Sequence, residues 1–463
     1  MQKKIVYILF VFFLSSCGLN KKYQRPAVPT VENYRNYSAK DSTSIGTINW
    51  RTYFDDSLLI NLIDTALSNN FDILRAEQSL KIANSLFRQA NAQFYPSINF
   101  GVSGSVSKPS TTTFSGQNIP ASQAVTDISI GPTFNWELDI WGKLRSQKKA
   151  TLASYNKSVH DRQFIQCSMI NAVVNYYYLL QSLDAKTEIL KATIINRVEG
   201  IETNKALKIA GSVTEVAVKQ NEALLYNAQA LLQDVINQIA ITENTLSVLI
   251  GKAPDDIRRS KLNTNVLPTK EWETGFPTQL LTNRTDINAA EQNLINAFEM
   301  VNFANASFYP TIGLSGQGGL NSMNFSKLFD VHSLFASIAG SIMQPLFNRR
   351  NLKTQKEVNV AKQEIALLDF KEKIITAYSE VANEINTLNV NADKLKLKEM
   401  ERDALYQSIV FSEELQKQGF VNYLEVLTAK NNELNAELSL IDIQLKILTS
   451  KANLYKALGG GWK

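Results

Sequence analysis

Few residues in this chain belong to the types that carry out chemistry. It has two histidines, His160 and His332, and two cysteines, Cys17 and Cys167. Two histidines leave little scope for a histidine-based metal site or a catalytic triad. The sequence also has no Walker, Cys-X-X-Cys or His-Glu-X-X-His motif. We therefore expect no catalytic residues, no metal site and no enzyme activity.

Cys17 is the residue for which the sequence predicts a chemical modification. Two lysines and an apolar run, residues 5–14, precede it, which is the order of a secretory signal peptide. The run is too short to span a bilayer of about 30 Å. Leu-Ser-Ser-Cys-Gly at 14–18 resembles a bacterial lipobox, in which the cysteine thiol takes a diacylglycerol and becomes the mature N-terminus. We predict a signal peptide at 1–16 and a covalent lipid on Cys17. The alternative is a plain signal peptide with a chance cysteine.

The residue after this cysteine indicates the compartment. Gly18 differs from the aspartate that commonly retains such lipoproteins in the inner membrane, so we expect the outer membrane. Two or three acyl chains make such anchoring stable. No cofactor besides this lipid is expected, and Cys167 is interpreted as a small core residue.

The composition excludes several further classes of protein. The chain has 463 residues, of which 44% are hydrophobic and 20% charged, so it is too apolar to be disordered. With 48 Lys plus Arg against 43 Asp plus Glu it is nearly neutral, and no basic cluster stands out as a nucleic-acid footprint. Two cysteines exclude a disulfide framework. Nucleic acid is therefore not an expected partner.

Most of the chain consists of two tandem copies of one repeat. Residues 76–96 and 290–310 match at 11 of 21 positions. Further on the matching offset falls from 214 to 208 residues, because one loop of the first copy is six residues longer. The predicted domains after the signal peptide are a lipid-anchored segment (17–66), repeat 1 (67–251), a linker (252–280), repeat 2 (281–459) and a tail (460–463).

Each repeat has the same order of elements. A helical stretch ends at Phe-Tyr-Pro, where proline stops the helix. Two segments follow in which apolar and polar residues alternate, as they do in strands with two different faces. Pro132 within one of them suggests a bulge or a bend. The expected helices are 57–93 and 279–307, and the expected strands are 97–107, 127–140, 311–320 and 335–347.

Each repeat then continues into a very long helix. From 143 to 210 the chain has no proline and a single glycine, Gly200, and from 351 to 418 it has neither. At 1.5 Å per residue such a helix is about 100 Å long. After Gly211 and Gly419 the chain returns as another helix, and the last helix has heptad spacing of its apolar residues. We predict antiparallel helical hairpins packed as coiled coils, with Gly211 and Gly419 in their turns.

The strands are long enough to cross an outer membrane. Their apolar rows suit lipid, and their small, uncharged polar rows suit a water-filled lumen. Four strands cannot close a barrel, so several copies must contribute, and three copies give a more usable pore than two. The alternative is an ordinary soluble pair of hairpins packed on helices. Aromatic residues at one end of both strand pairs predict a girdle at the membrane interface, formed by Phe94, Tyr95, Trp136, Trp141, Phe308, Tyr309 and Phe347.

Three motifs point to a known family. They are Tyr-Gln-Arg-Pro-Ala-Val-Pro at 23–29, Trp-Glu-Leu-Asp-Ile-Trp-Gly-Lys at 136–143 and Gln-Pro-Leu-Phe at 344–347. Together with the duplication and the long helices, they resemble the outer-membrane factor (TolC-like) family of tripartite efflux systems, in particular its OprM- and NodT-type lipoproteins. The sequence departs from that family at 284–286, where Arg-Thr-Asp replaces the usual Arg-Pro-Asp, and at 348–350, where glycines are frequent.

This resemblance implies a fold, a function and partners. The fold would be mainly α with transmembrane β: a long α-helical coiled-coil barrel continuous with an outer-membrane β-barrel of a homotrimer, four strands per protomer, with the linker in an equatorial belt. The chain would be a passive duct that extends into the periplasm, opened by a periplasmic adaptor and an inner-membrane pump, proton-driven by analogy. The alternative is a non-conducting, lipid-anchored bridging or adaptor protein, against which the duplicated strand pairs count. The cargo is not indicated.

The same resemblance implies where the duct closes. The tip would lie at the turns of Gly211 and Gly419, and the segment after Gly419 matches the family's gate. Leu424 falls at a constricting position, and three copies of Glu425 would repel one another and attract cations. Alternatively, Glu425 is a solvated carboxylate at a helix start, where the helix dipole favours it. The predicted gate residues are Tyr423, Leu424, Glu425 and Thr428, the last of which replaces a commonly acidic residue.

Overall fold

The computed structural model describes residues 21–35, 37–38, 42–113, 120, 123–263, 273–421 and 423–463. The predicted signal peptide and Cys17 lie outside these residues. The chain forms two compact units, and each unit contains residues of both predicted repeats. Unit 1 is Met1–Pro26, Lys81–Lys157 and Ala290–Asp369, and unit 2 is Ala27–Leu80, Ser158–Ala289 and Phe370–Lys463.

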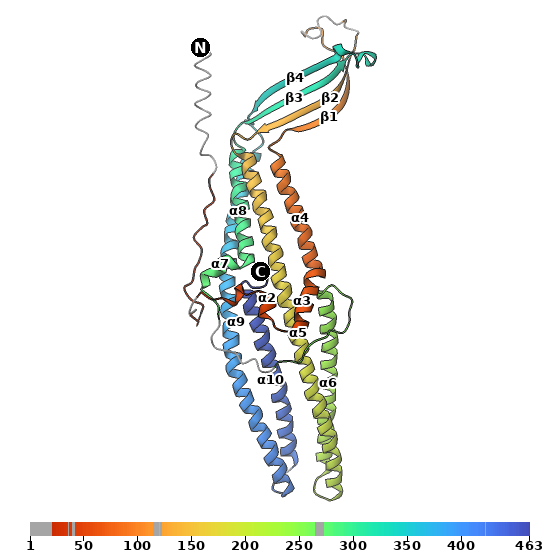
Figure 1. Ribbon diagram of the computed structural model, residues 1–463, viewed down its shortest axis with the longest axis vertical. Helices are drawn as coiled ribbons and strands as arrows, with labels where there is room; N and C mark the ends of the chain where they lie inside the picture. The colour runs from red at the N-terminus through yellow and green to blue at the C-terminus, as the bar shows by residue number, and fades with distance from the viewer. Residues whose placement is uncertain are drawn as a thin grey trace. The chain divides into compact units, whose positions relative to one another are not determined.

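Unit 1 contains an antiparallel sheet of four strands (Figure 1). Neighbouring strands follow one another in chain order, so the first and last strands are edges among the described residues. Two strands end earlier than expected. Asp139 instead accepts hydrogen bonds from the backbone N–H groups of Leu144 and Arg145, at 2.9 and 3.1 Å, and Pro345 has no N–H to donate. The strands are β1 (Ser97–Ser107), β2 (Val125–Leu138), β3 (Thr311–Ser322) and β4 (Leu334–Met343).

The register places the apolar rows of all four strands on one face. Val102 lies opposite Ile130, Ile130 opposite Leu320, and Leu320 opposite Leu334. Because side chains alternate with a period of two, the even-numbered residues of the sheet share this face. The other face carries mostly small or polar residues, and the hydroxyl oxygens of Ser103 and Ser129 lie 2.7 Å apart. One side of the sheet therefore suits lipid and the other suits water.

Pro132 does not produce the expected bulge. It pairs with Phe100 in an unbroken β1–β2 register, and the β2–β3 register is the same on both of its sides. The β2–β3 ladder is instead interrupted, because proline has no N–H to donate. A Cβ atom on the neighbouring Gly131 would lie 1.9 Å from the carbonyl oxygen of Gly318, so glycine permits this close approach. The expected bulge is therefore absent, and the other expectation, a bend, stays a prediction.

Four helices contribute to both units: α4 (Phe71–Ala92), α5 (Lys143–Ile209), α8 (Thr285–Ala306) and α9 (Asn351–Lys417). The stretches expected as single helices at 57–93 and 279–307 are each broken once. The side chain of Asn70 accepts hydrogen bonds from the backbone N–H groups of Asp72 and Ile73, at 2.7 and 3.2 Å, and so begins α4 as a new helix. The shorter helices that precede these breaks are α3 (Ser57–Asn69) and α7 (Leu280–Asn283).

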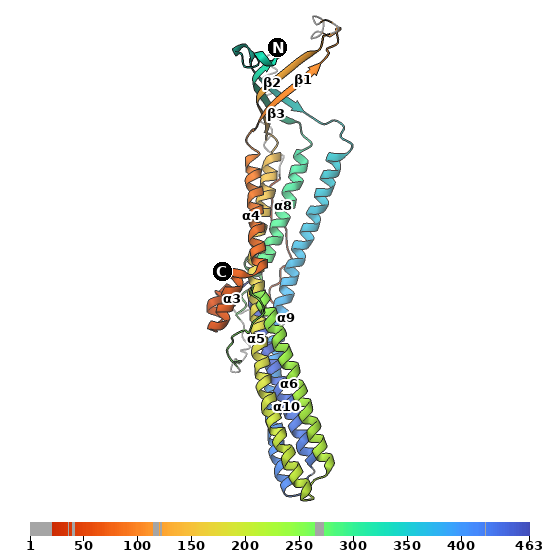
Figure 2. The same cartoon turned by 90° about the vertical axis from the view of Figure 1, so that its right-hand side faces the viewer.

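Unit 2 contains the greater part of two long helical hairpins (Figure 2). One pairs α5 with α6 (Glu215–Leu249), and the other pairs α9 with α10 (Tyr423–Ala457). Most of the predicted heptad positions of α10 are buried, namely Leu434, Ile441, Leu448, Ala452 and Tyr455. The remaining short elements of the chain are α2 (Trp50–Tyr53), η1 (Ile45–Thr47), η2 (Pro277–Gln279), η3 (Phe325–Lys327) and η4 (Val331–Ser333).

The core of unit 2 joins the short helix α3 to the long helices. Leu59 and Ile63 of α3 are fully buried in one cluster with Tyr177 of α5 and Leu246 of α6. The described part of the linker is tied to the same helices, because Arg259 forms ion pairs with Asp184 at 2.6 Å and with Glu243 at 2.5 Å. None of the helices in the described part of the chain is long and apolar enough to cross a membrane.

Candidate gate at the helical turns

The two hairpin turns have the same backbone geometry. Gly211 has a φ of +76° and Gly419 a φ of +79°, a left-handed conformation that glycine adopts with little strain. In the first turn the N–H of Gly211 donates to the Lys208 carbonyl and that of Ser212 to the Leu207 carbonyl, each at 2.9 Å. The second turn repeats this pair of bonds at 3.0 Å. Each long helix therefore ends in a Schellman turn at the predicted glycine.

Polar residues of three helices meet near these turns. Arg197 of α5 donates from Nη2 to the side-chain oxygen of Asn431 of α10, at 3.5 Å. Asn221 of α6 donates from Nδ2 to the hydroxyl of Tyr423 of α10, at 3.4 Å. Both bonds join one hairpin to the other. We call the residues around these bonds the tip cluster: Arg197, Gly200 and Asn204 of α5, Asn221 of α6, and Tyr423 and Asn431 of α10.

Gly200 makes room for this contact. A Cβ atom at position 200 would lie 3.1 Å from Nδ2 of Asn221 and 3.6 Å from the hydroxyl of Tyr423. Glycine inside a helix is less favourable than alanine by about 1 kcal/mol. The single glycine of this long helix thus stands where Asn221 of its own hairpin packs closely and Tyr423 of the other hairpin lies at ordinary contact distance.

Two members of the tip cluster have buried polar atoms without hydrogen-bond partners among the described residues. Asn204 is fully buried, and neither polar atom of its amide is hydrogen-bonded. Nε of Arg197 is also buried without a partner, and burial lowers the pKa of this guanidinium, an effect that Tyr423 opposes. Buried polar groups without partners are unfavourable by about 1–3 kcal/mol each. The packing of the tip cluster therefore leaves polar groups that separation of the hairpins would hydrate.

The predicted gate residues occupy the first turns of α10. Leu424 is 47% exposed and Glu425 is exposed, so both lie at the surface of the single chain. The hydroxyl of Thr428 donates a hydrogen bond to the Leu424 carbonyl of the same helix, at 2.9 Å. Of the four predicted residues, the structure therefore places Tyr423 against the other hairpin and leaves the other three on the surface. Their roles as a gate stay predictions.

The first turn differs from the second in the pairing of its acidic residue. Glu215 begins α6 and forms an ion pair with Lys208 of α5 across the turn, and Nζ of Lys219 lies 4.0 Å from it. The hydrogen bond from Lys208 lowers the pKa of the Glu215 carboxyl. Glu425, by contrast, has no ion pair among the described residues. Of these two carboxylates, only that of Glu425 is left unpaired in the described part of the chain for the predicted negative ring.

The predicted girdle residues lie at the ends of the strands in unit 1. The indole N–H of Trp141 donates to the Pro310 carbonyl at 2.7 Å, and its ring stacks on Tyr309 at 5.2 Å. The indole N–H of Trp136 donates to the Phe94 carbonyl at 2.9 Å. Aromatics of the two repeats are thus in direct contact. The other predicted members have exposed side chains, namely Tyr95, Phe308 and Phe347.

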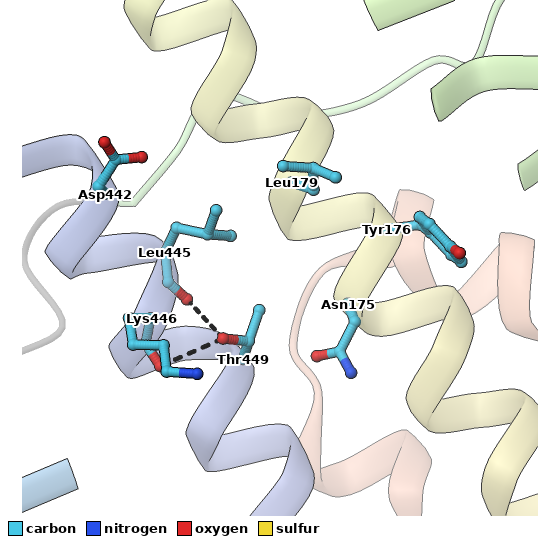
Figure 3. Close-up of a pocket in the computed structure, with 7 residues that line it drawn as sticks. All are labelled: Asn175, Tyr176, Leu179, Asp442, Leu445, Lys446 and Thr449. Atoms are coloured by element: carbon cyan, nitrogen blue, oxygen red, sulfur yellow. Dashed lines mark hydrogen bonds between the residues drawn. The ribbon is translucent and has the colours of Figure 1, made fainter. Parts of the chain in front are cut away.

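A pocket of about 280 Å³ lies between α5 and α10 of unit 2 (Figure 3). The hydroxyl of Thr449 points toward the α10 backbone, where it donates to the carbonyls of Leu445 and Lys446 at 2.9 and 3.2 Å. No nucleophile paired with a base lines the pocket. It is lined by Asn175, Tyr176, Leu179, Asp442, Leu445, Lys446 and Thr449.

The sequence matches the family model described as "Outer membrane efflux protein" over residues 62–252 and 276–460. The chain belongs to the outer membrane efflux protein family. The two matched segments together cover most of the chain and leave out the middle of the predicted linker. This match confirms the expected family.

Relatives of this outer membrane efflux protein cover its whole length. It is 28% identical to the solvent efflux pump outer membrane protein SrpC of Pseudomonas putida, over 100% of this chain and 99% of that protein. It is 25% identical to the cation efflux system protein CusC of Escherichia coli K12, over 99% of both chains. The crystal structure of CusC matches with a TM-score of 0.86 and 25% identity, covering 96% of this chain and all of that one. The Neisseria gonorrhoeae MtrE outer membrane channel in its open state matches at 0.85, with 25% identity and coverage of 96% and 99%.

Family membership confirms several expectations from the sequence. The fold class is a helical barrel with an oligomeric outer-membrane β-barrel. The protein is an efflux channel component of the outer membrane that extends into the periplasm. Its partners are further copies of the chain, a periplasmic adaptor and an inner-membrane pump. Sequence reasoning missed the tip cluster, for which the isolated Gly200 was the available signal.

Proposed function

We propose that this efflux protein acts as a passive trimeric duct that is closed at its periplasmic tip. The observation that carries the proposal is the contact of the two helical hairpins at the tip cluster. Arg197 and Asn221 lie on the first hairpin, and their hydrogen-bond partners lie on the second. A duct bounded by these hairpins opens when they separate.

The weakness of these contacts suits a gate. Both hydrogen bonds are long, at 3.4 and 3.5 Å, and each contributes only about 0.5–1.5 kcal/mol at ordinary length. An adaptor that binds the separated arrangement better therefore needs only a modest difference in affinity to shift the population. Opening also gives water access to Asn204 and to Nε of Arg197, which lack partners in the closed packing.

In this proposal the pump, and not the duct, determines which substrate is exported. One relative is named for solvent efflux and another for cation efflux, although both are similarly distant from this chain. A passive duct with mostly small polar residues along its lumen strands imposes little selection by chemistry. The chain itself catalyses no reaction, and the bridging alternative has no support from the relatives.

Crosslinking in cells tests the proposed assembly. A tagged chain is crosslinked in living cells, purified, and its companions are identified by mass spectrometry. We expect trimers together with a periplasmic adaptor and an inner-membrane transporter, whose type identifies the pump. Recovery of monomers or dimers without an inner-membrane partner would exclude the duct and favour the bridging protein.

We further propose that the lipid is attached to Cys17, which lies outside the described residues. Cells are fed a palmitate analogue that can be labelled after purification. The chain should be labelled, and Cys17→Ala should abolish the label because the thiol is the acceptor. Cys167→Ala is the matched control, since Cys167 is buried and burial raises its pKa to about 12. Persistent labelling of Cys17→Ala would exclude this site.

A further inference from the structure

A short segment that follows β4 combines exposed apolar residues with four cations. We call Gln344–Lys356 the interface segment. Leu346 and Phe347 are 94% and 88% exposed, and they continue the exposed apolar side chains of Ile338 and Ile342 on β4. Leu346 and Phe347 thus lie between the lipid-facing surface of the sheet and the start of helix α9.

The backbone of this segment is strained at two arginines. Arg349 has a φ of 55° and Arg350 a φ of 67°, in the left-handed region that disfavours residues with a Cβ atom. At the repeat offset of 208, Arg350 corresponds to Gly142, whose φ is 77°. The first repeat therefore has the unstrained residue and the second has an arginine in the same conformation. Backbone strain of this kind marks functional positions. We therefore attribute the presence of arginine here to a role of its side chain, since the backbone conformation disfavours it.

The two repeats also differ in how the cations between the strands and the long helices are paired. In the first repeat Lys143 pairs with Glu137 and Arg145 with Asp139, each at 2.9 Å. In the second repeat only Arg350 is paired, with Glu357 at 3.0 Å. The three other cations of the interface segment have no ion pair among the described residues, and they are Arg349, Lys353 and Lys356.

A pocket adjoins one of these cations. Lys356 lines a space of about 300 Å³ together with Asn305, Phe308 and Tyr309. Its Nζ lies 5.9 Å from the centre of the Phe308 ring. A cation beside aromatic rings, next to exposed apolar side chains, matches the chemistry of the boundary between acyl chains and headgroups.

We propose that the interface segment binds anionic phospholipid in the leaflet of the outer membrane that faces the periplasm. Leu346 and Phe347 contact the acyl chains, and the arginines bind the phosphate, which guanidinium matches in geometry. The continuity with the lipid-facing row of β4 favours lipid over a second copy of the chain as the partner. The inference rests on the family's place in the outer membrane, and it is independent of how the tip opens.

Lipid retention by the full-length protein tests this proposal. Purified trimers are incorporated into nanodiscs of phosphatidylcholine with one fifth phosphatidylglycerol, and spin-labelled phosphatidylglycerol reports the immobilised fraction. We expect immobilisation above that of spin-labelled phosphatidylcholine. The double substitution Arg349→Gly/Arg350→Gly should weaken the binding of phosphatidylglycerol by roughly fivefold per arginine removed. Since glycine relieves the strained backbone, the melting temperature in pure phosphatidylcholine should not fall.

The matched control removes the same charge elsewhere in unit 1. Lys81→Gln/Lys362→Gln alters two exposed lysines on helices and should leave phosphatidylglycerol retention unchanged. Equal retention by the wild type and the glycine variant would overturn the proposal. Loss of trimers in phosphatidylcholine, with normal lipid retention by those that remain, would instead place the arginines between copies. Neither result bears on conduction, so the duct proposal is tested separately.

Discussion

Channels carrying Gly200→Leu are expected to conduct without an adaptor. The leucine side chain needs the space that Asn221 and Tyr423 occupy, since even a Cβ atom at position 200 lies 3.1 Å from the first and 3.6 Å from the second. Loss of the Asn221–Tyr423 hydrogen bond between the hairpins destabilises their packed arrangement by about 0.5–1.5 kcal/mol, which raises the open population roughly 2- to 10-fold. Leucine is the better helix former, so α5 itself should persist. Conductance of purified trimers in a planar bilayer measures the effect.

Thr203→Leu is the matched control for this experiment. Thr203 lies on the same helix with an exposed side chain, so added bulk there does not press on the tip cluster. Its conductance should equal that of the wild type. If Gly200→Leu also stays closed, the tip cluster does not hold the gate.

The double substitution Leu424→Ala/Glu425→Ala tests the predicted constriction in the same conductance experiment. This variant should conduct more than the wild type and should lose preference for cations, because the acidic ring is removed. Unchanged conductance and reversal potential would remove both residues from the gate. The two variants therefore separate a contact between hairpins from a ring at the pore axis.

Arg284→Ala is expected to destabilise the folded chain by about 3–5 kcal/mol, the usual effect of removing one partner of a buried ion pair. Arg284 is 5% exposed and holds both carboxylate oxygens of Asp286, at 3.0 and 2.7 Å. It also binds Glu380 at 2.5 Å and the Ala457 carbonyl at 3.2 Å. The substitution leaves Asp286 buried without its cation. Thermal or denaturant unfolding, followed by circular dichroism, measures the loss.

An exposed pair of the same type is the control. Arg51 and Asp64 form an ion pair with side chains 51% and 41% exposed, and Arg51→Ala should change stability by less than about 1 kcal/mol. Equal effects of the two substitutions would contradict the role given to burial.

The stability from Asp286 should also depend on pH. Burial acts to raise the pKa of this carboxyl, but the hydrogen bonds and charge of Arg284 outweigh burial and hold the pKa below its ordinary value. A lowered pKa in the folded state gives stability that is complete above about pH 4 and decreases as the pH falls through the folded value. In Arg284→Ala this part of the pH dependence should disappear.

Local sequence pattern was sufficient to predict much of this fold. Alternation over 97–107 predicted β1 with its observed bounds, and missing prolines predicted α5 and α9. Positive φ at Gly211 and Gly419 follows from glycine at the ends of long helices. The misjudged details depend on single side chains. Asn70 caps a new helix, and Pro132 is accommodated by glycines of the neighbouring strand rather than by a bulge.

The elements, their faces, the duplication and the family could be predicted from the sequence, because each of these depends on spacing along one segment. The contacts between distant residues could not, and they are known from the packing of the folded chain: Gly200 with Asn221 and Tyr423, Trp141 with Tyr309, and Arg284 with Glu380. Periodicity defines the buried side of a helix, but the rotation and offset of packed helices select the contacting pair. A lone glycine or a buried arginine therefore acquires its role from the element packed against it.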